Sequence, residues 1–221
     1  MTHLEHELSR LKNEINEMGT LVQGQLKKSI EAFTTVDKDL ARQIIFQDRR
    51  VNAEELKIDR DCENIMALFN PVAIDLRQVF ATFKINSHFE RIGDHAKGIA
   101  RYALELNEPY DEKIIADLNL MNMYELVDSM ITDNIQAFEE ADTAEARTIF
   151  GKDLEVDEMN HKATIVIAKY IKERTDNIGP LLNLIFVSKK LERIGDLNTN
   201  IAEEIIFFVE ANVLKHEKEK L

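Results

Sequence analysis

The sequence predicts an all-α protein made of two tandem three-helix bundles, with six long helices related by an internal repeat. Three observations support this fold class. Only seven Gly and three Pro occur in 221 residues, which is few for the many turns of a sheet protein. Apolar residues recur at steps of three and four over long stretches, as on one face of a helix. A block of the first half also returns in the second.

The first helix is expected over residues 4–33, where Leu, Ile, Met, Val and Phe follow one another in a narrow apolar stripe. Asp37 is a candidate N-cap for a second helix that runs to about Phe69. The pair Asn70-Pro71 interrupts the pattern there. Pro71 suits the first turn of a third helix, which should end near Leu106.

The second half repeats this plan after the break at Asn107-Glu108-Pro109. Its expected helices span residues 111–140, 143–174 and 179–213. The domains are therefore placed at residues 1–108 and 109–221.

The internal repeat is visible in the sequence of the last helix of each half. Residues 89–94 read FERIGD and residues 191–196 read LERIGD, and Ile99-Ala100 is matched by Ile201-Ala202. Repetition of this kind indicates structural copies, each a hairpin of long helices with one further helix packed on it.

Charge and composition exclude several classes of protein. The chain has 41 acids against 28 bases and a formal charge of −13, so its average field repels nucleic acids. The charged N-terminus does not resemble a secretory signal, and no stretch approaches about 18 uninterrupted apolar residues. A cytoplasmic protein is expected. The single Cys62 can form no internal disulfide and is expected to be an ordinary helix residue.

Carboxylates spaced four apart are the candidate functional residues, because that spacing places both on one helix face. The repeated block carries two such pairs, and the preceding helix of each half offers a second pair of oxygen ligands. The candidate metal ligands are Asp48, Asn52, Glu90 and Asp94 in the first half, and Asp153, Asp157, Glu192 and Asp196 in the second.

The register of the helices predicts that these pairs meet. Asp48 and Glu90 lie at similar distances before and after the break at Asn70, so an antiparallel hairpin brings them to the same height. The same count around Thr175 brings Asp153 level with Glu192. Facing carboxylates repel unless a cation lies between them.

Oxygen ligands alone favour hard cations such as Mg²⁺, Ca²⁺, Mn²⁺ or iron over a closed structural zinc site. Asn52 stands where the second half has Asp157, which predicts tighter metal binding in the second half. Gly93 and Gly195 each cost a helix about 1 kcal/mol relative to Ala, so a close neighbour is expected at both. The alternative is that the acids are a solvated face paired with nearby arginines.

Two further residues lack a counterpart in the other half. His95 follows Asp94 and is a possible ligand or orienting group, although the copy has Leu197 and a polar helix residue is the commoner role. Arg77 is expected to form an interhelix salt bridge.

The repeated block, together with Asn200-Ile201-Ala202-Glu203 and Asp75-Leu76-Arg77, resembles the signature of the PhoU family over essentially the whole chain. That resemblance implies a non-enzymatic negative regulator of phosphate uptake and phosphate-responsive signalling. It implies docking on a phosphate-responsive sensor histidine kinase and on the ATPase subunit of a phosphate ABC transporter, so that the protein is peripheral to the membrane through its partners.

The resemblance also implies multinuclear metal clusters on the Glu/Asp-x-x-x-Asp motifs, with iron favoured and Zn, Mn or Mg as alternatives. Asn52 departs from the motif, which leaves the nuclearity of the first cluster open. The oligomeric state is open as well, with a homodimer possible.

Three other functions remain as alternatives. A ferritin-like carboxylate-bridged iron oxidase or store needs two Glu-x-x-His motifs, and only residues 158–161 provide one. A metal-dependent phosphohydrolase lacks an evident nucleophile or Gly-rich phosphate loop. A metal-free helical scaffold requires only that the acid pairs point to solvent.

Overall fold

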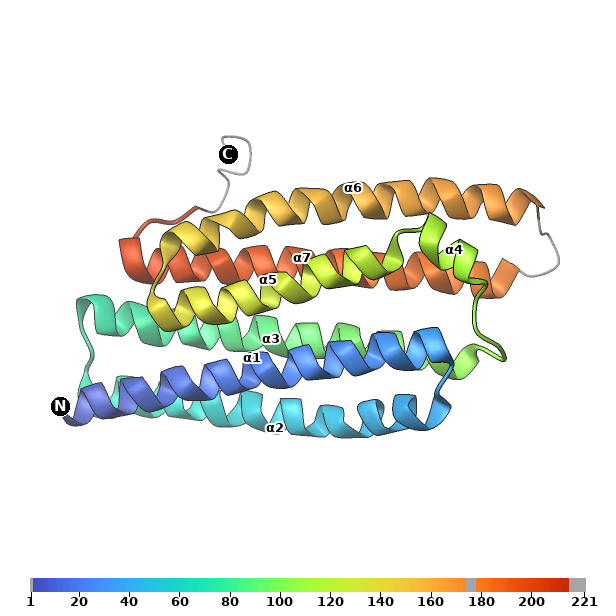
Figure 1. Ribbon diagram of the computed structural model, residues 1–221. Helices are drawn as coiled ribbons and strands as arrows, with labels where there is room; N and C mark the ends of the chain where they lie inside the picture. The colour runs from blue at the N-terminus through green and yellow to red at the C-terminus, as the bar shows by residue number, and fades with distance from the viewer. Residues whose placement is uncertain (1, 174–177, 215–221) are drawn as a thin grey trace.

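The structure is a computed structural model that describes residues 2–173 and 178–214, and all the regular elements of these residues are α-helices (Figure 1). The helices in chain order are α1 (His3–Thr35), α2 (Lys38–Phe69), α3 (Ala73–Glu105), α4 (Glu112–Asp117), α5 (Leu120–Glu140), α6 (Thr143–Glu173) and α7 (Ile178–Glu210). The predicted fold class is confirmed.

The starts of α1 and α2 are fixed by side-chain caps. The Thr2 hydroxyl accepts from the backbone N–H of Glu5, whose carboxylate accepts in turn from the Thr2 backbone. Asp37 Oδ1 accepts from the backbone N–H groups of Asp39 at 3.0 Å and Leu40 at 2.9 Å. These bonds satisfy donors that have no partner inside a helix. They confirm Asp37 as the predicted N-cap.

The turn between α2 and α3 differs from the prediction. Asn70 ends α2 in the left-handed conformation, with a φ of 49°. Pro71 and Val72 then form an extended link, and α3 begins only at Ala73. The expectation that Pro71 lies in the first helical turn is therefore wrong.

The expected helix over residues 111–140 is also wrong, because it is broken into α4 and α5. The break falls at Asn119, whose φ of 55° is left-handed. Asparagine tolerates this conformation better than most residues. The break lets Ile114, Leu118 and Leu120 all turn inward, where each is at most 4% exposed. A straight helix could not bury all three against the same core.

The last two helices follow the prediction closely. α6 spans Thr143–Glu173 and α7 spans Ile178–Glu210. The expected helix end at Arg174 and the pivot at Thr175 lie outside the described residues. α7 ends at Glu210, three residues before the expected Val213. The next residue, Ala211, adopts a left-handed φ of 56°.

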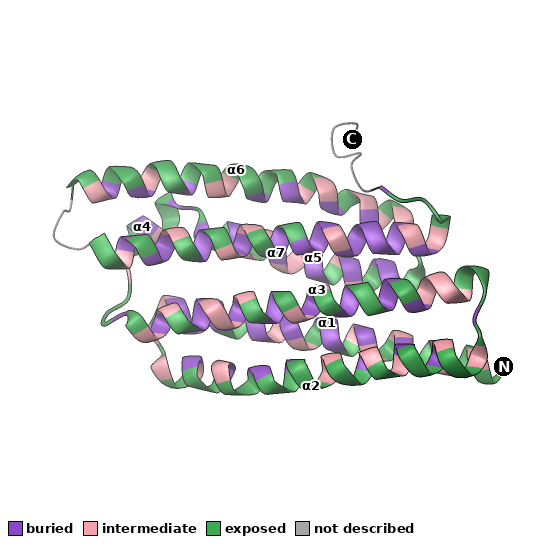
Figure 2. Cartoon of the chain, turned by 180° about the vertical axis from the view of Figure 1, so that it is seen from behind, coloured by how far each residue is buried: buried purple, intermediate pink, exposed green. Residues whose placement is uncertain are grey.

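The helices form two bundles that lie side by side. α1, α2 and α3 make the first bundle, and α5, α6 and α7 make the second, with α4 at one end (Figure 1). α3 and α7 meet in the middle of the molecule, while α2 and α6 lie at opposite edges, as Figure 2 shows from behind. α1 and α5 also touch across the front face. The predicted division into two three-helix units is thus seen in the arrangement of the helices.

The contact between α3 and α7 is antiparallel and runs along most of both helices. Near one end, Asn183 donates to Glu105 at 3.2 Å, and the rings of Tyr102 and Phe186 stack with centroids 5.8 Å apart. Near the other end, Lys84 Nζ lies 3.0 Å from both carboxylate oxygens of Glu204. This helix pair therefore fixes the two bundles relative to each other.

The core is a continuous set of aliphatic and aromatic side chains shared by both bundles. Cys62 lies within it on α2, and burial raises the pKa of its thiol to about 12, so the reactive thiolate is disfavoured. None of the described helices combines the length and the apolar composition that crossing a membrane requires.

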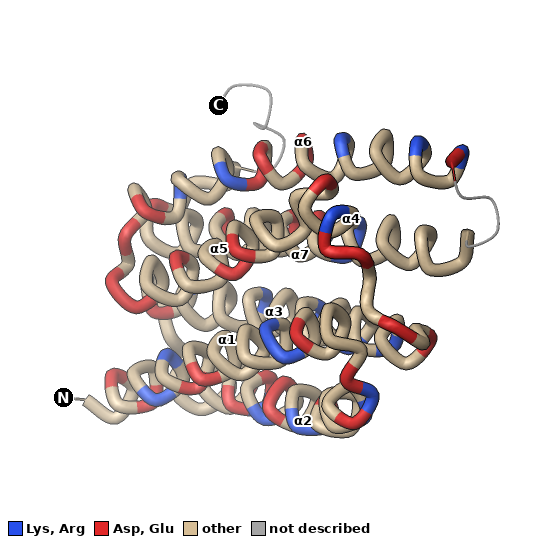
Figure 3. Tube along the Cα trace, turned by 45° about the vertical axis from the view of Figure 1, so that its right-hand side comes forward, with Lys and Arg blue, Asp and Glu red and all other residues tan. Residues whose placement is uncertain are grey.

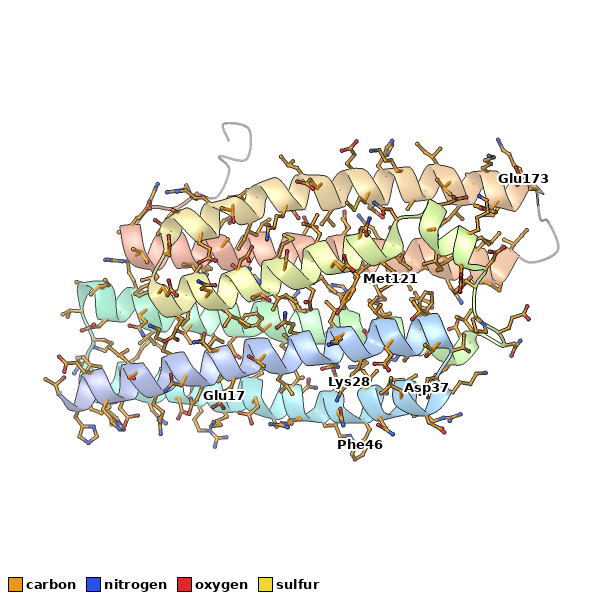
Figure 4. All side chains as sticks on the ribbon, viewed as in Figure 1. Glu17, Lys28, Asp37, Phe46, Met121 and Glu173 are labelled. Carbon is orange, nitrogen blue, oxygen red and sulfur yellow. The ribbon has the colours of Figure 1, made fainter. Side chains whose placement is uncertain are left out.

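Phe33 and Phe46 give a matched test of this packing. Phe33 is fully buried and its ring lies 5.4 Å from that of Tyr110, in the link between the bundles. Phe46 is 66% exposed and points away from the bundle (Figure 4). Phe33→Ala is expected to lower the free energy of unfolding by about 3–5 kcal/mol in urea titrations. Phe46→Ala should change the free energy of unfolding by no more than about 1 kcal/mol. That figure includes the loss of the contact between the Phe46 ring and the Arg49 guanidinium. Equal losses would contradict the assigned core.

Candidate metal centre

Figure 3 shows Asp and Glu spread over both bundles rather than gathered at one end. The candidate ligands are the subset that lies where α2 meets α3 and where α6 meets α7. In both hairpins the helices approach closely at a glycine. A β-carbon at Gly93 would lie 3.2 Å from Val51, and one at Gly195 would lie 2.9 Å from Asp153 Oδ1. The expectation of close neighbours at both glycines is confirmed.

In the first half the structure brings Asp48 of α2 and Asp94 of α3 to the same ammonium group. Lys97 Nζ lies 2.6 Å from Asp48 Oδ2 and 2.8 Å from Asp94 Oδ1. Gln25 of α1 donates to the other oxygen of Asp48 at 3.3 Å. The register expected from the sequence put Asp48 level with Glu90, and the structure brings it together with Asp94, one turn further along α3. Asn52 lies one turn further along α2 and is exposed.

Glu90 belongs to the same cluster but has a different environment. Burial raises its pKa, and the charges of Asp94, Glu55 and Asp48 raise it further, while Lys97 partly opposes them. The pKa of Lys97 lies above its ordinary value, because the opposing effect of burial is outweighed by its hydrogen bonds and charge interactions with Asp48 and Asp94. The first half thus holds an excess of carboxylates around one ammonium.

In the second half Asp153 is buried, only 7% exposed, beside the backbone of Gly195. The Glu192 side chain is 12% exposed, and its Oε1 pairs with Lys189. Its Oε2 is buried without a hydrogen-bond partner among the described residues. Asp157 and Asp196 are exposed on the same two helices. The structure therefore brings Asp153 to α7 and leaves a buried oxygen of Glu192 unsatisfied.

Carboxylate oxygens are suitable ligands for a hard metal ion, and an unsatisfied buried oxygen is the kind of atom that such an ion would satisfy. With the side chains placed as they are, residues 2–173 and 178–214 contain no group of three His, Cys, Asp or Glu that could hold a metal ion. Metal binding by the candidate ligands stays a prediction.

Sequence reasoning missed Lys97, Gln25 and Glu55. Lys97 follows Asp94 at the spacing of an ion pair on one helix, which is a common pattern and gave no reason to single it out. Its second contact, to Asp48, depends on the approach of α2 and has no signal in the sequence. Gln25 reaches Asp48 from α1, a helix that carries none of the repeated acid pairs.

The structure also places the two unmatched residues, His95 and Arg77. Burial, and after it the charges of Lys190, Arg193 and Arg91, lower the pKa of His95 to about 4, so the imidazole is neutral and lies beside cations. Arg77 Nε donates to the backbone carbonyl of Phe208 at 3.0 Å. It joins α3 to α7 through a carbonyl, so the expectation of a salt bridge is corrected.

The ferritin-like alternative is not supported. Its single Glu-x-x-His motif consists of Glu158 and His161, which are both exposed on α6. Glu158 pairs with Lys162 at 2.6 Å, also at the surface. A di-iron site of that class needs ligands that project into the bundle.

Comparison with known proteins gives consistent results for sequence and structure. The model of the PhoU domain matches residues 15–103 and 120–205, one match in each half. The chain is 34% identical over 210 residues to the phosphate-specific transport system accessory protein PhoU of Edwardsiella tarda, covering 95% of this chain and 86% of that one. It is 35% identical to the PhoU homolog of Aquifex aeolicus, covering 97% of each.

Two solved structures have the same fold. The phosphate transport system regulatory protein PhoU from Streptococcus pneumoniae superposes with a TM-score of 0.87 at 28% identity, over 96% of this chain and 99% of that one. PhoU from Pseudomonas aeruginosa superposes with a TM-score of 0.88 at 30% identity, over 95% and 100%.

The close approach at Gly195 can be tested against Gly151, an exposed helical glycine with no atom within 4 Å of its β-carbon position. Gly151→Ala is expected to raise the free energy of unfolding by about 0.5–1 kcal/mol, the usual gain in a helix. Gly195→Ala should instead lower it by about 1–3 kcal/mol, because the added carbon overpacks Asp153 and Val156. Chemical denaturation measures both. A gain at Gly195 equal to that at Gly151 would contradict the geometry.

Proposed function

Because this chain belongs to the PhoU family, we propose that it is a regulatory accessory protein of a phosphate-specific transport system, and not an enzyme. The observation that carries the proposal is the likeness over nearly the whole chain, in both halves, to proteins named for that role. A regulator of this kind would act by docking on partner proteins. The all-helical body and the lack of a Gly-rich phosphate loop in the sequence are consistent with that role.

The proposed partners are the sensor histidine kinase that responds to phosphate and the ATPase subunit of the transporter. The protein would act in the cytoplasm as a negative regulator and reach the membrane through these partners. Large apolar side chains stand exposed at the two outer helices, including Phe46 and Leu56 on α2 and Leu154 on α6, at 64–70% exposure. Surfaces with exposed apolar groups are the kind that protein partners cover.

We further propose that the carboxylates of the second half hold a multinuclear metal cluster, with iron favoured and zinc, manganese or magnesium as alternatives. The ligands are Asp153, Asp157, Glu192 and Asp196. Bound metal would place positive charge among these acids and would join α6 to α7. Metal would then stabilise the docked shape by mass action, since the unfolded chain lacks the assembled site. In the first half the corresponding residues are Asp48, Asn52, Glu90 and Asp94.

The metal content of the purified protein tests the proposed metal binding directly. Purified protein is incubated with Fe²⁺, Mn²⁺ or Zn²⁺, desalted, and subjected to elemental analysis. Glu192→Gln with Asp196→Asn is expected to lose most of the bound metal, because both changes remove anionic ligands of one site. The control removes two exposed carboxylates elsewhere, Glu31→Gln with Glu63→Gln, and should keep it. Equal metal in both variants would refute the proposed ligands.

The regulatory role is tested in an Escherichia coli strain that lacks its own PhoU, a protein 33% identical to this chain. Expression of this chain is expected to restore restraint of phosphate uptake in phosphate-rich medium. The Escherichia coli protein on the same vector is the positive control. Unrestrained uptake, with the chain present and folded and the control active, would count against the proposal.

A further inference from the structure

Positive charge is concentrated along the outer edge of the contact between α3 and α7, in a protein that is acidic as a whole. Figure 2 shows these two helices side by side on the back of the molecule, and the formal charge of the chain is −13. The cations gather about one half-buried imidazole, that of His95. We call them the cation cluster, which consists of Arg91 and Arg101 of α3 with Lys190 and Arg193 of α7.

The charges of the cation cluster are close enough to affect one another across the two helices. Partial burial, and after it the charges of Arg193 and Arg101, lower the pKa of Lys190. The negative charge of Asp94 opposes them with the smallest of these effects. Its carboxylate is already paired with Lys97 at 2.8 Å. A local excess of positive charge therefore remains at this edge of the two helices.

The cation cluster has no counter-charge in direct contact within the part of the chain that the structure describes. None of its four side chains forms a hydrogen bond or an ion pair with another residue in the ranges 2–173 and 178–214. Two other half-buried lysines differ in this respect, because Lys97 contacts a carboxylate at 2.6 Å and Lys152 contacts one at 2.5 Å. Like charges held together without a counter-ion cost free energy, which a bound anion would offset.

A helical glycine makes room for the amine of Lys190. A β-carbon at Gly98 would lie 2.6 Å from Lys190 Cε and closer still to Nζ, so a larger residue would push the amine away. Glycine weakens the interior of a helix relative to alanine, and at this position it allows a cation to lie against the α3 backbone. In the sequence of α3, Gly98 lies between the two arginines of the cation cluster. The amine of Lys190 is therefore packed among the other cations.

One helical turn further along, the cation cluster meets an aromatic pair. Tyr102 follows Gly98 by four residues on α3. Phe186 precedes Lys190 by four residues on α7, and its ring stacks on that of Tyr102 with the centroids 5.8 Å apart. Phe186 is 48% exposed, so its ring is open to a ligand. An open aromatic ring beside cations can stack on a base while the cations contact phosphates.

We propose that the cation cluster is a binding site for the phosphate group of a small molecule, which is either free phosphate or a nucleotide. Lys190 and Arg193 would contact the phosphate from α7, and Arg91 from α3. Arginine binds phosphate oxygens through two parallel N–H groups, and lysine adds a compact charge. The site uses none of the carboxylates proposed to hold metal. It goes beyond the proposed regulatory role and depends on neither that role nor bound metal.

Isothermal titration calorimetry on the full chain measures this binding. The protein is treated with EDTA and desalted, so that no metal takes part, and inorganic phosphate and ATP are titrated separately at constant ionic strength. Lys190→Met with Arg193→Gln is expected to weaken the binding of both ligands by at least about tenfold, because two charge-assisted contacts are lost. The control makes the same two changes at exposed positions, Lys28→Met with Arg42→Gln, and should bind as wild type does.

The two ligands distinguish the source of the phosphate group. If the site takes a nucleotide, Phe186→Ala is expected to weaken ATP binding by about fivefold or more and to leave the binding of inorganic phosphate unchanged, because only the base stacks on the ring. If the site takes free phosphate, Phe186→Ala leaves both affinities unchanged.

The melting temperature separates a binding role of these cations from a structural one. In phosphate-free buffer, Lys190→Met with Arg193→Gln is expected to melt at the wild-type temperature or above it, because repulsion between like charges is relieved. Inorganic phosphate should raise the melting temperature of wild type and leave that of the variant unchanged. A lower melting temperature of the variant in phosphate-free buffer would assign both cations a structural role and contradict the inference.

Gly98→Ala tests the position of the Lys190 amine while it keeps every charge. The added carbon displaces the amine, so phosphate binding should weaken several-fold although the helix itself is stabilised. Gly151→Ala, at a helical glycine with no atom within 4 Å of its β-carbon position, is the matched control and should leave binding unchanged. Wild-type binding by Gly98→Ala would show that the proposed geometry is wrong.

Two results of the calorimetry would overturn the inference outright. The first is that neither inorganic phosphate nor ATP binds to the EDTA-treated chain. The second is that Lys190→Met with Arg193→Gln binds both ligands as tightly as wild type does. Neither result bears on the proposed regulatory role, which is tested by phosphate uptake, or on the proposed metal binding, which is tested by metal content.

Discussion

The burial of one carboxylate in each helical hairpin is the constraint on which the surrounding structure depends. Asp48 is 4% exposed and Asp153 is 7% exposed. An ionised carboxylate removed from water costs several kcal/mol unless donors or a cation compensate it. Gly93 and Gly195 allow the two helices of each hairpin to approach closely. The compensating charge must therefore come from a side chain of the protein or from a bound ion.

The contact between α3 and α7 makes the two hairpins parts of one body. Both helices carry a Glu and Asp pair of the repeated block, and they pack against each other along most of their length. Polar contacts fix the ends of this pair, with Lys84 on Glu204 and Asn183 on Glu105. A change in the position of α7 relative to α6 must therefore be accommodated by α3 as well. The two hairpins are therefore mechanically joined through α3 and α7.

Helical periodicity, caps and the repeat were sufficient to predict the number of bundles and most helix ends. These features are local, so they can be recognised from a single sequence. The break at Asn119 was missed because a left-handed asparagine inside an apolar pattern has no distinct spacing. The position of Pro71 was missed because its role depends on how α3 packs on α2.

The candidate acids were also found from local spacing. The register of the hairpin put Asp48 level with Glu90, whereas the structure brings it together with Asp94, one turn further along α3. The compensating residues were not found, because Lys97 and Gln25 reach Asp48 from two other helices.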